Sequence, residues 1–312
     1  MMLAISLAPR ATSQSAFQFL RSDISARIAG MGGAFLSMQN DPNLLFVNPA
    51  GLATLSGPQA SAAYLDHLMD INGGSFVYAS EWDPVGPVAV GVTYYHYGTF
   101  DETDALLNTG GTFSATDLAL TVGAALPLSP TMFLGGSVKI VHSSIADYRS
   151  SALAADVGFL FTVPEERLAV GVAVLHAGTQ LSTFNGVRES LPLDVRVGIT
   201  KRPEHLPVYL NLNLYRLQDP DVPLRDRLLQ FSAGAEFDLS SSLRLRVGYN
   251  NQLRKDLRLG TTAGLAGFSG GIGVTVGGYL VDYAFSSYGS IGGLHRFAIS
   301  SLLSHASGSV PE

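Results

Sequence analysis

Apolar and polar residues alternate with a period of two along most of this chain. Leu193 and Val195 alternate with Asp194 and Arg196, and the same rhythm recurs in 210–214, 229–237, 243–250 and 279–286. Successive side chains of a β-strand point to opposite faces. Each stretch is therefore predicted to be a strand with one apolar face and one polar or small-residue face.

The alternation predicts fourteen strands. They fall at 59–65, 73–82, 86–97, 113–126, 131–143, 152–163, 167–177, 190–201, 207–217, 227–238, 241–251, 268–276, 278–287 and 293–303. An even number is typical of single-chain bacterial barrels, whose turns are short on the periplasmic side and longer outside. We expect periplasmic turns at 83–85 and 164–166, and extracellular loops at 98–112, 144–151, 178–189 and 218–226.

Three features favour a membrane barrel over a soluble β-sandwich, which would also alternate. Many stretches are about ten residues long, the length of a tilted spanning strand. Their polar faces are rich in Gly, Ala, Ser and Thr, which suits a lumen that holds water or a plug. Aromatic residues cluster at strand ends, where interfacial girdles are expected: Tyr94, Tyr95, Tyr97, Tyr215, Tyr249 and Tyr288. We predict an all-β fold, a 14-stranded antiparallel transmembrane β-barrel.

Two long uncharged stretches do not read as membrane helices. The stretch 259–281 is rich in glycine, and each glycine costs a helix about 1 kcal/mol relative to alanine. Ile272, Val274 and Val276 within it alternate with Gly273 and Thr275. The stretch 118–138 contains two prolines, at 127 and 130, which predict a turn between two strands.

Composition narrows the class further. Charged residues make up only 14% of the 312 residues, the net charge is −6, and there is no cysteine. Mean hydropathy is +0.25. This balance argues against a disordered or nucleic-acid-binding protein. The absence of cysteine excludes disulfides, thiol catalysis and zinc held by cysteine.

We expect four regions along the chain. Residues 1–13 are predicted to be a shortened signal peptide, because an apolar run is followed by small residues, with Arg10 after the run. Residues 14–58 precede the first strand without alternation and are predicted to be a plug inside the lumen. Residues 59–303 form the barrel, and 304–312 a polar tail. The candidate plug residues are Arg27, Gly32, Gly33, Asp41, Asn48 and Pro49.

The polar faces of the strands supply the predicted lumen residues. These are Asp194, Arg196, Asn211, Asn213, Glu236, Arg244, Arg246 and Asp282. A buried charge is costly unless it is paired. We therefore expect Arg27 to pair with Asp194, Glu236 or Asp282, and Asp41 to pair with Arg196, Arg244 or Arg246. The sequence 48–50 is expected to form the turn into the first strand.

Motifs for chemistry are weak. Residues 267–271 match a nucleophile-elbow pattern and are followed by Asp282 and His295, but an elbow requires a helix after the turn, and a strand pattern follows here. The histidines lack metal-ligand spacing. The acidic run Asp101, Glu102 and Asp104 is interpreted as a solvated loop. We expect no catalytic residue, no metal and no cofactor, which leaves an enzyme as the weakest alternative.

Several blocks resemble one family of barrels. The early blocks span 17–20, 25–27, 32–33, 41–42 and 48–50, with the sequences FQFL, SAR, GG, DP and NPA. Together they look like the N-terminal part of the PorV/PorQ group within the FadL-like class. Further blocks resemble PorQ: 70–72 with Tyr78, 97–102, 191–194 and 201–205. The likeness covers nearly the whole mature chain.

The resemblance implies a role in the type IX secretion system of the bacterial outer membrane. PorQ-like barrels are implied to be non-enzymatic members of an attachment complex, with a PorZ-like surface protein and PorU/PorV-like components as partners, beside outer-membrane lipid and lipopolysaccharide and without nucleic acid. The alternative is a FadL-like channel for hydrophobic small molecules, with residues 14–58 as its hatch. For the first reading, the expected partner-contact residues are Phe100, Asp101, Tyr148, Phe184 and Arg225.

Overall fold

The computed structural model describes residues 15–103, 109–219, 222–257 and 264–302. The expected signal peptide at 1–13, the polar tail at 304–312 and Asp104 lie outside the described residues. Among the described helices, none is long and apolar enough to cross a membrane.

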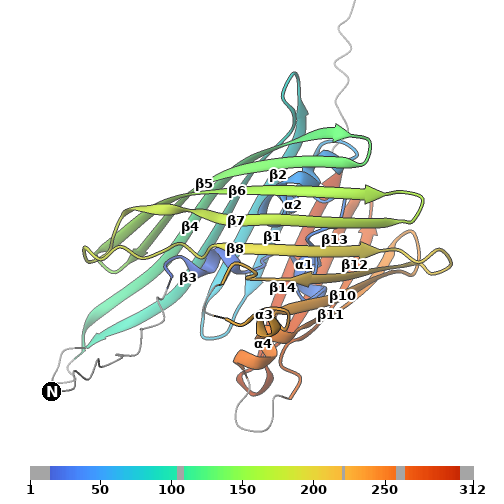
Figure 1. Cartoon of the computed structure of the whole chain (residues 1–312). Helices are drawn as coiled ribbons and strands as arrows, with labels where there is room; N and C mark the ends of the chain where they lie inside the picture. The colour runs from blue at the N-terminus through green and yellow to red at the C-terminus, as the bar shows by residue number, and fades with distance from the viewer. Residues whose placement is uncertain (1–14, 104–108, 220–221, 258–263, 303–312) are drawn as a thin grey trace, which may run out of the picture.

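Fourteen antiparallel strands close into a barrel in which β1 pairs with both β2 and β14. Every other strand pairs with its neighbours in sequence, as Figure 1 shows. The predicted fold is confirmed. The strands are β1 Gln59–Asp66, β2 Asn72–Trp82, β3 Gly86–Thr103, β4 Thr109–Ser129, β5 Met132–Ile145, β6 Tyr148–Val163, β7 Leu168–Ser182, β8 Asp194–Lys201, β9 Val208–Leu214, β10 Phe231–Asp238, β11 Leu243–Asn250, β12 Phe268–Val276, β13 Tyr279–Ser287 and β14 Gly293–Leu302.

The outer face of the barrel is apolar. On β4, Leu118, Leu120 and Val122 are between 42% and 46% exposed, whereas the intervening Ala119 and Thr121 are buried. Exposed leucine, valine, isoleucine and aromatic side chains continue this pattern around the ring. A soluble protein would not present such a surface to water, whereas a membrane-spanning barrel requires it.

Two of the expected loops, 98–112 and 144–151, are largely strand, and a third, 178–189, is strand as far as Ser182. The stretches 98–112, 144–151 and 178–189 were expected outside the barrel wall. However, β3 and β4 stay paired as far as Thr103 and Thr109, β5 and β6 as far as Ile145 and Tyr148, and β7 runs to Ser182. Backbone pairing does not need an apolar face, so a hairpin can continue past the point where alternation ends. Figure 1 shows the β3–β4 hairpin reaching beyond its neighbours.

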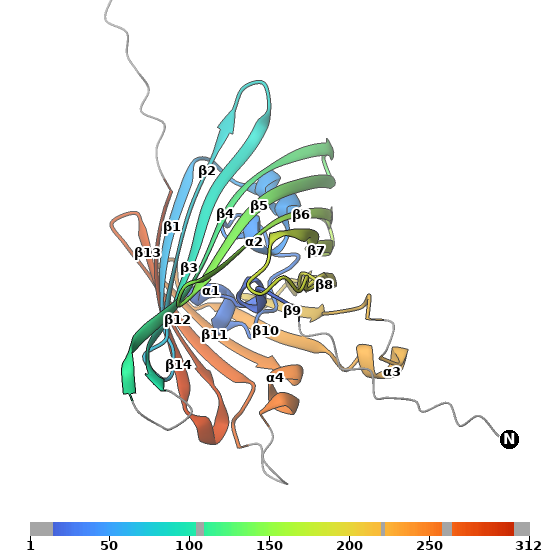
Figure 2. The same ribbon diagram turned by 90° about the vertical axis from the view of Figure 1, so that its left-hand side faces the viewer.

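Residues 15–58, hereafter the N-terminal segment, lie inside the ring of strands. They contain the short helices η1 Gln18–Arg21, α1 Ala26–Gly30, α2 Leu44–Val47 and η2 Pro49–Thr54. Figures 1 and 2 show α1 and α2 among the strands in both views. The remaining helices lie in connections between strands: α3 Leu224–Arg227, α4 Asn251–Asp256 and η3 Gly289–Ile291.

The segment crosses the barrel from one end to the other. The amide of Ala16 donates to the carbonyl of Ser190, in the connection between β7 and β8, and η2 leads into β1 at the opposite end. We call the end with connections 183–193, 215–230, 251–267 and 288–292 the long-loop end. The end with the turns 83–85, 164–166, 239–242 and 277–278 is the short-turn end.

The hydrophobic core lies within the lumen rather than between sheets. Met31, Phe35, Leu36, Leu44 and Leu45 of the N-terminal segment are fully buried. Small inward-facing residues of the strands, such as alanines on β2, β3 and β7, pack around them. The interior is therefore packed like that of a soluble protein, enclosed by a wall that faces lipid.

Candidate functional site: the filled lumen

Glycines on the inner wall allow the N-terminal segment to lie against the strands. A Cβ at Gly135 would overlap Pro49 and the amide of Ala50, and one at Gly248 would overlap the amide of Gly32. The same relation between a wall glycine and the segment recurs on β3, β4, β6, β7, β8 and β10, at Gly91, Gly123, Gly158, Gly171, Gly198 and Gly234. At Gly135, Gly171, Gly234 and Gly248 a Cβ would meet backbone atoms of the segment, so any side chain at these four positions would displace it.

The path of the segment requires glycine at two of its own positions. Gly32 and Gly33 have φ angles of +65° and +83°, in the left-handed region that favours glycine. A Cβ at Gly32 would also lie 2.7 Å from the amide nitrogen of Tyr249 on β11. This pair turns the chain after α1 and lets it run close to the wall.

A buried ion-pair network holds the segment to β10, β11 and β13. Arg27 binds Glu236 at 2.7 Å and Asp41 at 2.9 Å. Glu236 also accepts from Arg246, and Arg246 in turn binds Asp282. Alternating charges inside a low-dielectric interior stabilise one another while each stays hydrogen-bonded.

The partner of Arg27 is one of the three acids expected for it, but the partner of Asp41 is not among those expected. Asp41 pairs with Arg27 of the same segment instead of Arg196, Arg244 or Arg246. The remaining oxygen of Asp41 accepts from the backbone and side-chain nitrogens of Asn43. The chain turns back on itself between these residues, so the nearest cation is within the segment.

Asn48 ties the segment to the wall at η2. Its side-chain oxygen accepts from the amide of Ala50, as a helix N-cap. Its side-chain nitrogen donates to the carbonyls of Leu36 and Phe159, the latter on β6. Residues 48–50 therefore begin a 3-10 helix rather than the expected simple turn into β1, and Pro49 occupies its first position.

A second buried cluster, which the sequence analysis did not single out, lies on β5, β6 and β7. The ammonium of Lys139 binds Asp156 at 2.7 Å and lies 3.2 Å from Nδ1 of His176. His176 has a left-handed φ of 60° at a bulge in β7, and its amide donates to Asp156. The available signal was a lysine and an aspartate at inward positions of two adjacent strands.

Six tyrosines were expected in the aromatic girdles at the membrane surface, but four of them lie inside the barrel or bond to residues of its interior. Tyr95 is buried and donates to Ser22, while Tyr97 donates to Asp117. Tyr215 donates to the carbonyl of Gly33, and Tyr288 lines an internal cavity. Adjacent residues on a strand must face opposite sides, so Tyr94 can face the membrane only if Tyr95 faces the lumen.

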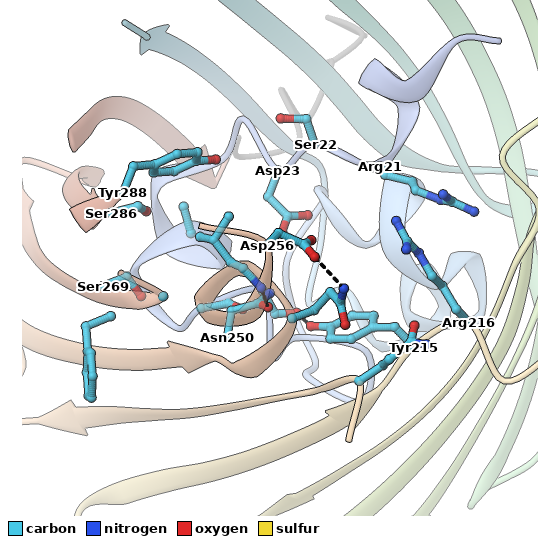
Figure 3. A pocket seen from close by; sticks show the side chains of 18 of the residues that line it. Arg21, Ser22, Asp23, Tyr215, Arg216, Asn250, Asp256, Ser269, Ser286 and Tyr288 are labelled. Carbon is cyan, nitrogen blue, oxygen red and sulfur yellow. Dashed lines mark hydrogen bonds between the residues drawn. The ribbon is translucent and has the colours of Figure 1, made fainter. Parts of the chain in front are cut away.

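The lumen contains a cavity at each end, with the N-terminal segment between them. A cavity of about 260 Å³ opens at the long-loop end, lined by Asp23, Arg216 and Tyr288 among others, and Figure 3 shows it from close by. A cavity of about 490 Å³ lies at the short-turn end beside Asp238 and Arg244. A pocket of about 40 Å³ between them lies under Phe19 and Phe46.

Neither a protein-family model nor a curated protein matches this sequence. Solved structures do. The toluene transporter TbuX of Ralstonia pickettii aligns over 90% of this chain and 98% of its own, with a TM-score of 0.60 at 12% identity. The toluene transporter TodX of Pseudomonas putida aligns over 88% and 95%, with a TM-score of 0.58 at 12% identity.

A FadL homologue of Pseudomonas aeruginosa aligns over 89% of this chain and 98% of its own, with a TM-score of 0.55 at 10% identity. The fold is that of the FadL-like barrels. The likeness supports the broader class named by the sequence resemblance, and at this level of identity it concerns the fold alone. It carries nothing specific to PorQ or to type IX secretion.

The predicted lumen residues of the barrel face inward. Asp194, Arg196, Asn211 and Asn213 are buried, and Arg244 is one-third exposed near the short-turn end, where it binds Asp238. Asp194 pairs with Arg196 at 2.9 Å rather than with the segment. The polar face is thus packed against protein over most of its length, with water-accessible space at its ends.

The elbow-like motif does not assemble a catalytic triad. The hydroxyl of Ser269 donates to the carbonyl of Gly30, Asp282 binds Arg246, and Nδ1 of His295 lies 2.8 Å from the hydroxyl of Tyr283. Each residue has a structural partner of its own. Within the described ranges, no three acidic or histidine side chains are grouped as a metal site would require.

The expected partner-contact residues lie at or near the long-loop end, but not all on loops. Phe100 and Asp101 are on β3, where the ring of Phe100 stacks on Phe113 at 5.3 Å. Tyr148 begins β6 and is 58% exposed. Phe184 is half-buried in the β7–β8 connection, and Arg225 is exposed on α3.

Proposed function

We propose that this FadL-like barrel is a channel of the bacterial outer membrane for hydrophobic small molecules, with the N-terminal segment as its gate. The observation that carries the proposal is the position of the segment between two internal cavities. Solutes entering at the long-loop end reach the short-turn end only if part of the segment moves. In bacterial barrels these ends face the outside and the periplasm, respectively.

The central pocket is lined by both apolar and charged side chains, and its apolar part supports a hydrophobic solute. Apolar side chains of the segment line one side of it, namely Phe19, Leu20, Ile24, Ile28, Phe46 and Val47. Ion pairs at Arg27 and hydrogen bonds at Asn48 fix the segment to the wall. Such contacts can break and re-form, as a gate requires. The similar structures include barrels described as toluene transporters, which favours the same class of solute here.

A disulfide between the segment and the wall tests the gate. The hydroxyls of Ser37 and Thr200 on β8 are 2.7 Å apart, so cysteines at these two positions are placed to bond. The chain has no cysteine of its own. We expect the oxidised S37C/T200C variant to block toluene entry into proteoliposomes and the reduced variant to restore it.

Each single cysteine variant is the control for the substitution itself. Complete oxidation with unchanged toluene flux would contradict a gate at this part of the segment. Absence of toluene flux in the unmodified protein, beside a flux through a known channel in the same vesicles, would overturn the proposed function altogether.

A second candidate is the type IX scaffold implied by the sequence blocks. Its support in the structure is the exposed aromatic surface at the long-loop end, where Phe100 is 44% and Tyr148 58% exposed. Such residues are common anchors of protein interfaces. In this reading a PorZ-like protein binds this rim, in a complex with PorU/PorV-like components. Deleting the gene would then release the PorZ-like protein from the cell surface while toluene uptake stays normal.

A further inference from the structure

Most of the side chains that line the cavity at the long-loop end are polar or charged, in contrast to the hydrophobic solute proposed for the channel. Its only aliphatic or phenyl side chains are Ala29, Leu253 and Phe268. Four arginines and three aspartates line it, together with serine, asparagine, glutamine and tyrosine side chains. Hydrocarbon would leave these groups without hydrogen-bond partners, at a cost for each one.

Two of the arginines are left without a carboxylate. Arg21 donates to the carbonyl of Leu193 and to Gln18, and its Nε is buried with no partner. The side chain of Arg216 has no hydrogen bond or ion pair with any described residue. Figure 3 shows both guanidinium groups on the same side of the cavity.

The two charges act on each other. The pKa of Arg21 is lowered to about 10, chiefly by burial and then by the positive charge of Arg216. Two guanidinium groups at close range repel each other unless an anion lies between them. Asp194 and Asp219 also act on Arg21, but among the described residues neither forms an ion pair with the two guanidinium groups, which together can accept a further negative charge.

Partners are present for four other charges of the cavity, Asp194, Asp256, Arg196 and Arg296, of which Asp256 accepts from the side chain of Gln252. Asp194 binds Arg196 and accepts from the amide of Arg216. Arg296 donates to the carbonyl of Asp23 and to Ser286. Burial raises the pKa of the Asp23 carboxyl, with Arg196 and Arg296 acting against this shift, so Asp23 carries its charge less readily than a free aspartate.

We propose that the long-loop cavity binds a small, wholly polar ligand that carries an oxyanion, held between Arg21 and Arg216. Guanidinium groups bind carboxylate and phosphate oxygens through paired, charge-assisted hydrogen bonds. The polar walls contributed by Ser269, Asn250 and Gln230 provide partners for further hydroxyl or amide groups. The site adjoins the pocket under Phe46, with which it shares Arg21, Ser22 and Asp23, and the inference does not depend on transport of hydrocarbon.

Isothermal titration of the full-length protein in detergent tests the site. The probes are succinate and inorganic phosphate as polar oxyanions, glycerol as a neutral polar molecule, and decanoate as a carboxylate with a hydrocarbon chain. We expect succinate or phosphate to bind and glycerol not to bind. R216Q should weaken the binding about tenfold or more, because a charge-assisted contact is lost.

The side chain of Arg216 makes no hydrogen bond or ion pair with a described residue and its charge repels that of Arg21, so R216Q should not lower the melting temperature. The matched control is R149Q, at an exposed arginine on β6 that does not line the cavity, and its affinity should equal that of the unmodified protein. Three outcomes would overturn the inference: no binding of either oxyanion, binding that R216Q leaves intact, or tighter binding of decanoate than of succinate.

Discussion

The guanidinium of Arg27 donates two hydrogen bonds, of 2.9 and 2.7 Å, to the carboxylate of Glu236 on β10. This pair joins the N-terminal segment to the wall, and Glu236 is only 1% exposed. E236Q leaves two buried arginines, Arg27 and Arg246, without their shared carboxylate. We expect it to lower the free energy of unfolding by about 3–5 kcal/mol, measured by urea unfolding in lipid vesicles.

E166Q is the matched control for this prediction. Glu166 also pairs with a basic residue, Lys201, but the two side chains are 69% and 42% exposed. An exposed pair contributes about 0–1 kcal/mol. Equal effects of the two substitutions would show that the pair in the lumen does not anchor the segment.

The glycines of the wall predict a sharp difference between neighbours. In G135A the new methyl group would overlap Pro49 and Ala50, whereas in G136A the nearest atom would be 3.6 Å away. We expect G135A to cost about 1–3 kcal/mol through overpacking and to increase ion conductance in planar bilayers, because the segment is displaced. G136A should leave both quantities unchanged, and an unaltered G135A would refute tight contact at η2.

The two faces of the wall should respond differently to charge. Val138 is 52% exposed near the middle of β5 and faces lipid. V138R should cost about 2–4 kcal/mol in a vesicle folding assay. T275R should change the free energy of folding much less, because Thr275 lines the cavity of about 490 Å³ at the short-turn end. Equal costs would contradict the assignment of lipid and lumen faces.

Stability should depend on pH through Asp23. Burial raises the pKa of its carboxyl above the ordinary value of 3.8, so the folded protein binds this proton more tightly than the unfolded chain does. The resulting stabilisation is complete below the ordinary pKa and is lost as the pH rises through the raised one. D23N should abolish that decline and be more stable than the parent near neutral pH. Urea midpoints at a series of pH values check this, and parallel curves for both proteins would disprove it.

The strands could be predicted because the membrane imposes a strict rule on alternate residues. The expected range 59–65 became Gln59–Asp66, and 268–276 was found unchanged. The continuation of β3 through Phe100 could not be predicted, because it depends on backbone pairing with Phe113 rather than on an apolar face. The alternation of apolar and polar residues ends where the strand leaves the lipid, whereas the backbone hydrogen bonds between the strands continue beyond that point.

The ion-pair partners of residues inside the lumen were harder to predict than which side chains face the lumen. Parity along β10 and β11 placed Glu236 and Arg246 inward, and the register then puts them directly opposite each other. No periodic rule places Asp41 beside Arg27, since the chain between them is irregular. Sequence patterns thus identify the wall of the lumen, and only the folded path of the segment identifies what it binds.

The contacts of the N-terminal segment also constrain how the barrel assembles. Its residue Asp23 is held by Arg296 on β14, and Arg27 by Glu236 on β10, although the segment is synthesised before either strand. Threading it through a finished ring would require breaking many buried contacts. We therefore expect the strands to close around the segment during assembly, so that β1 and β14 pair only once the segment is in place.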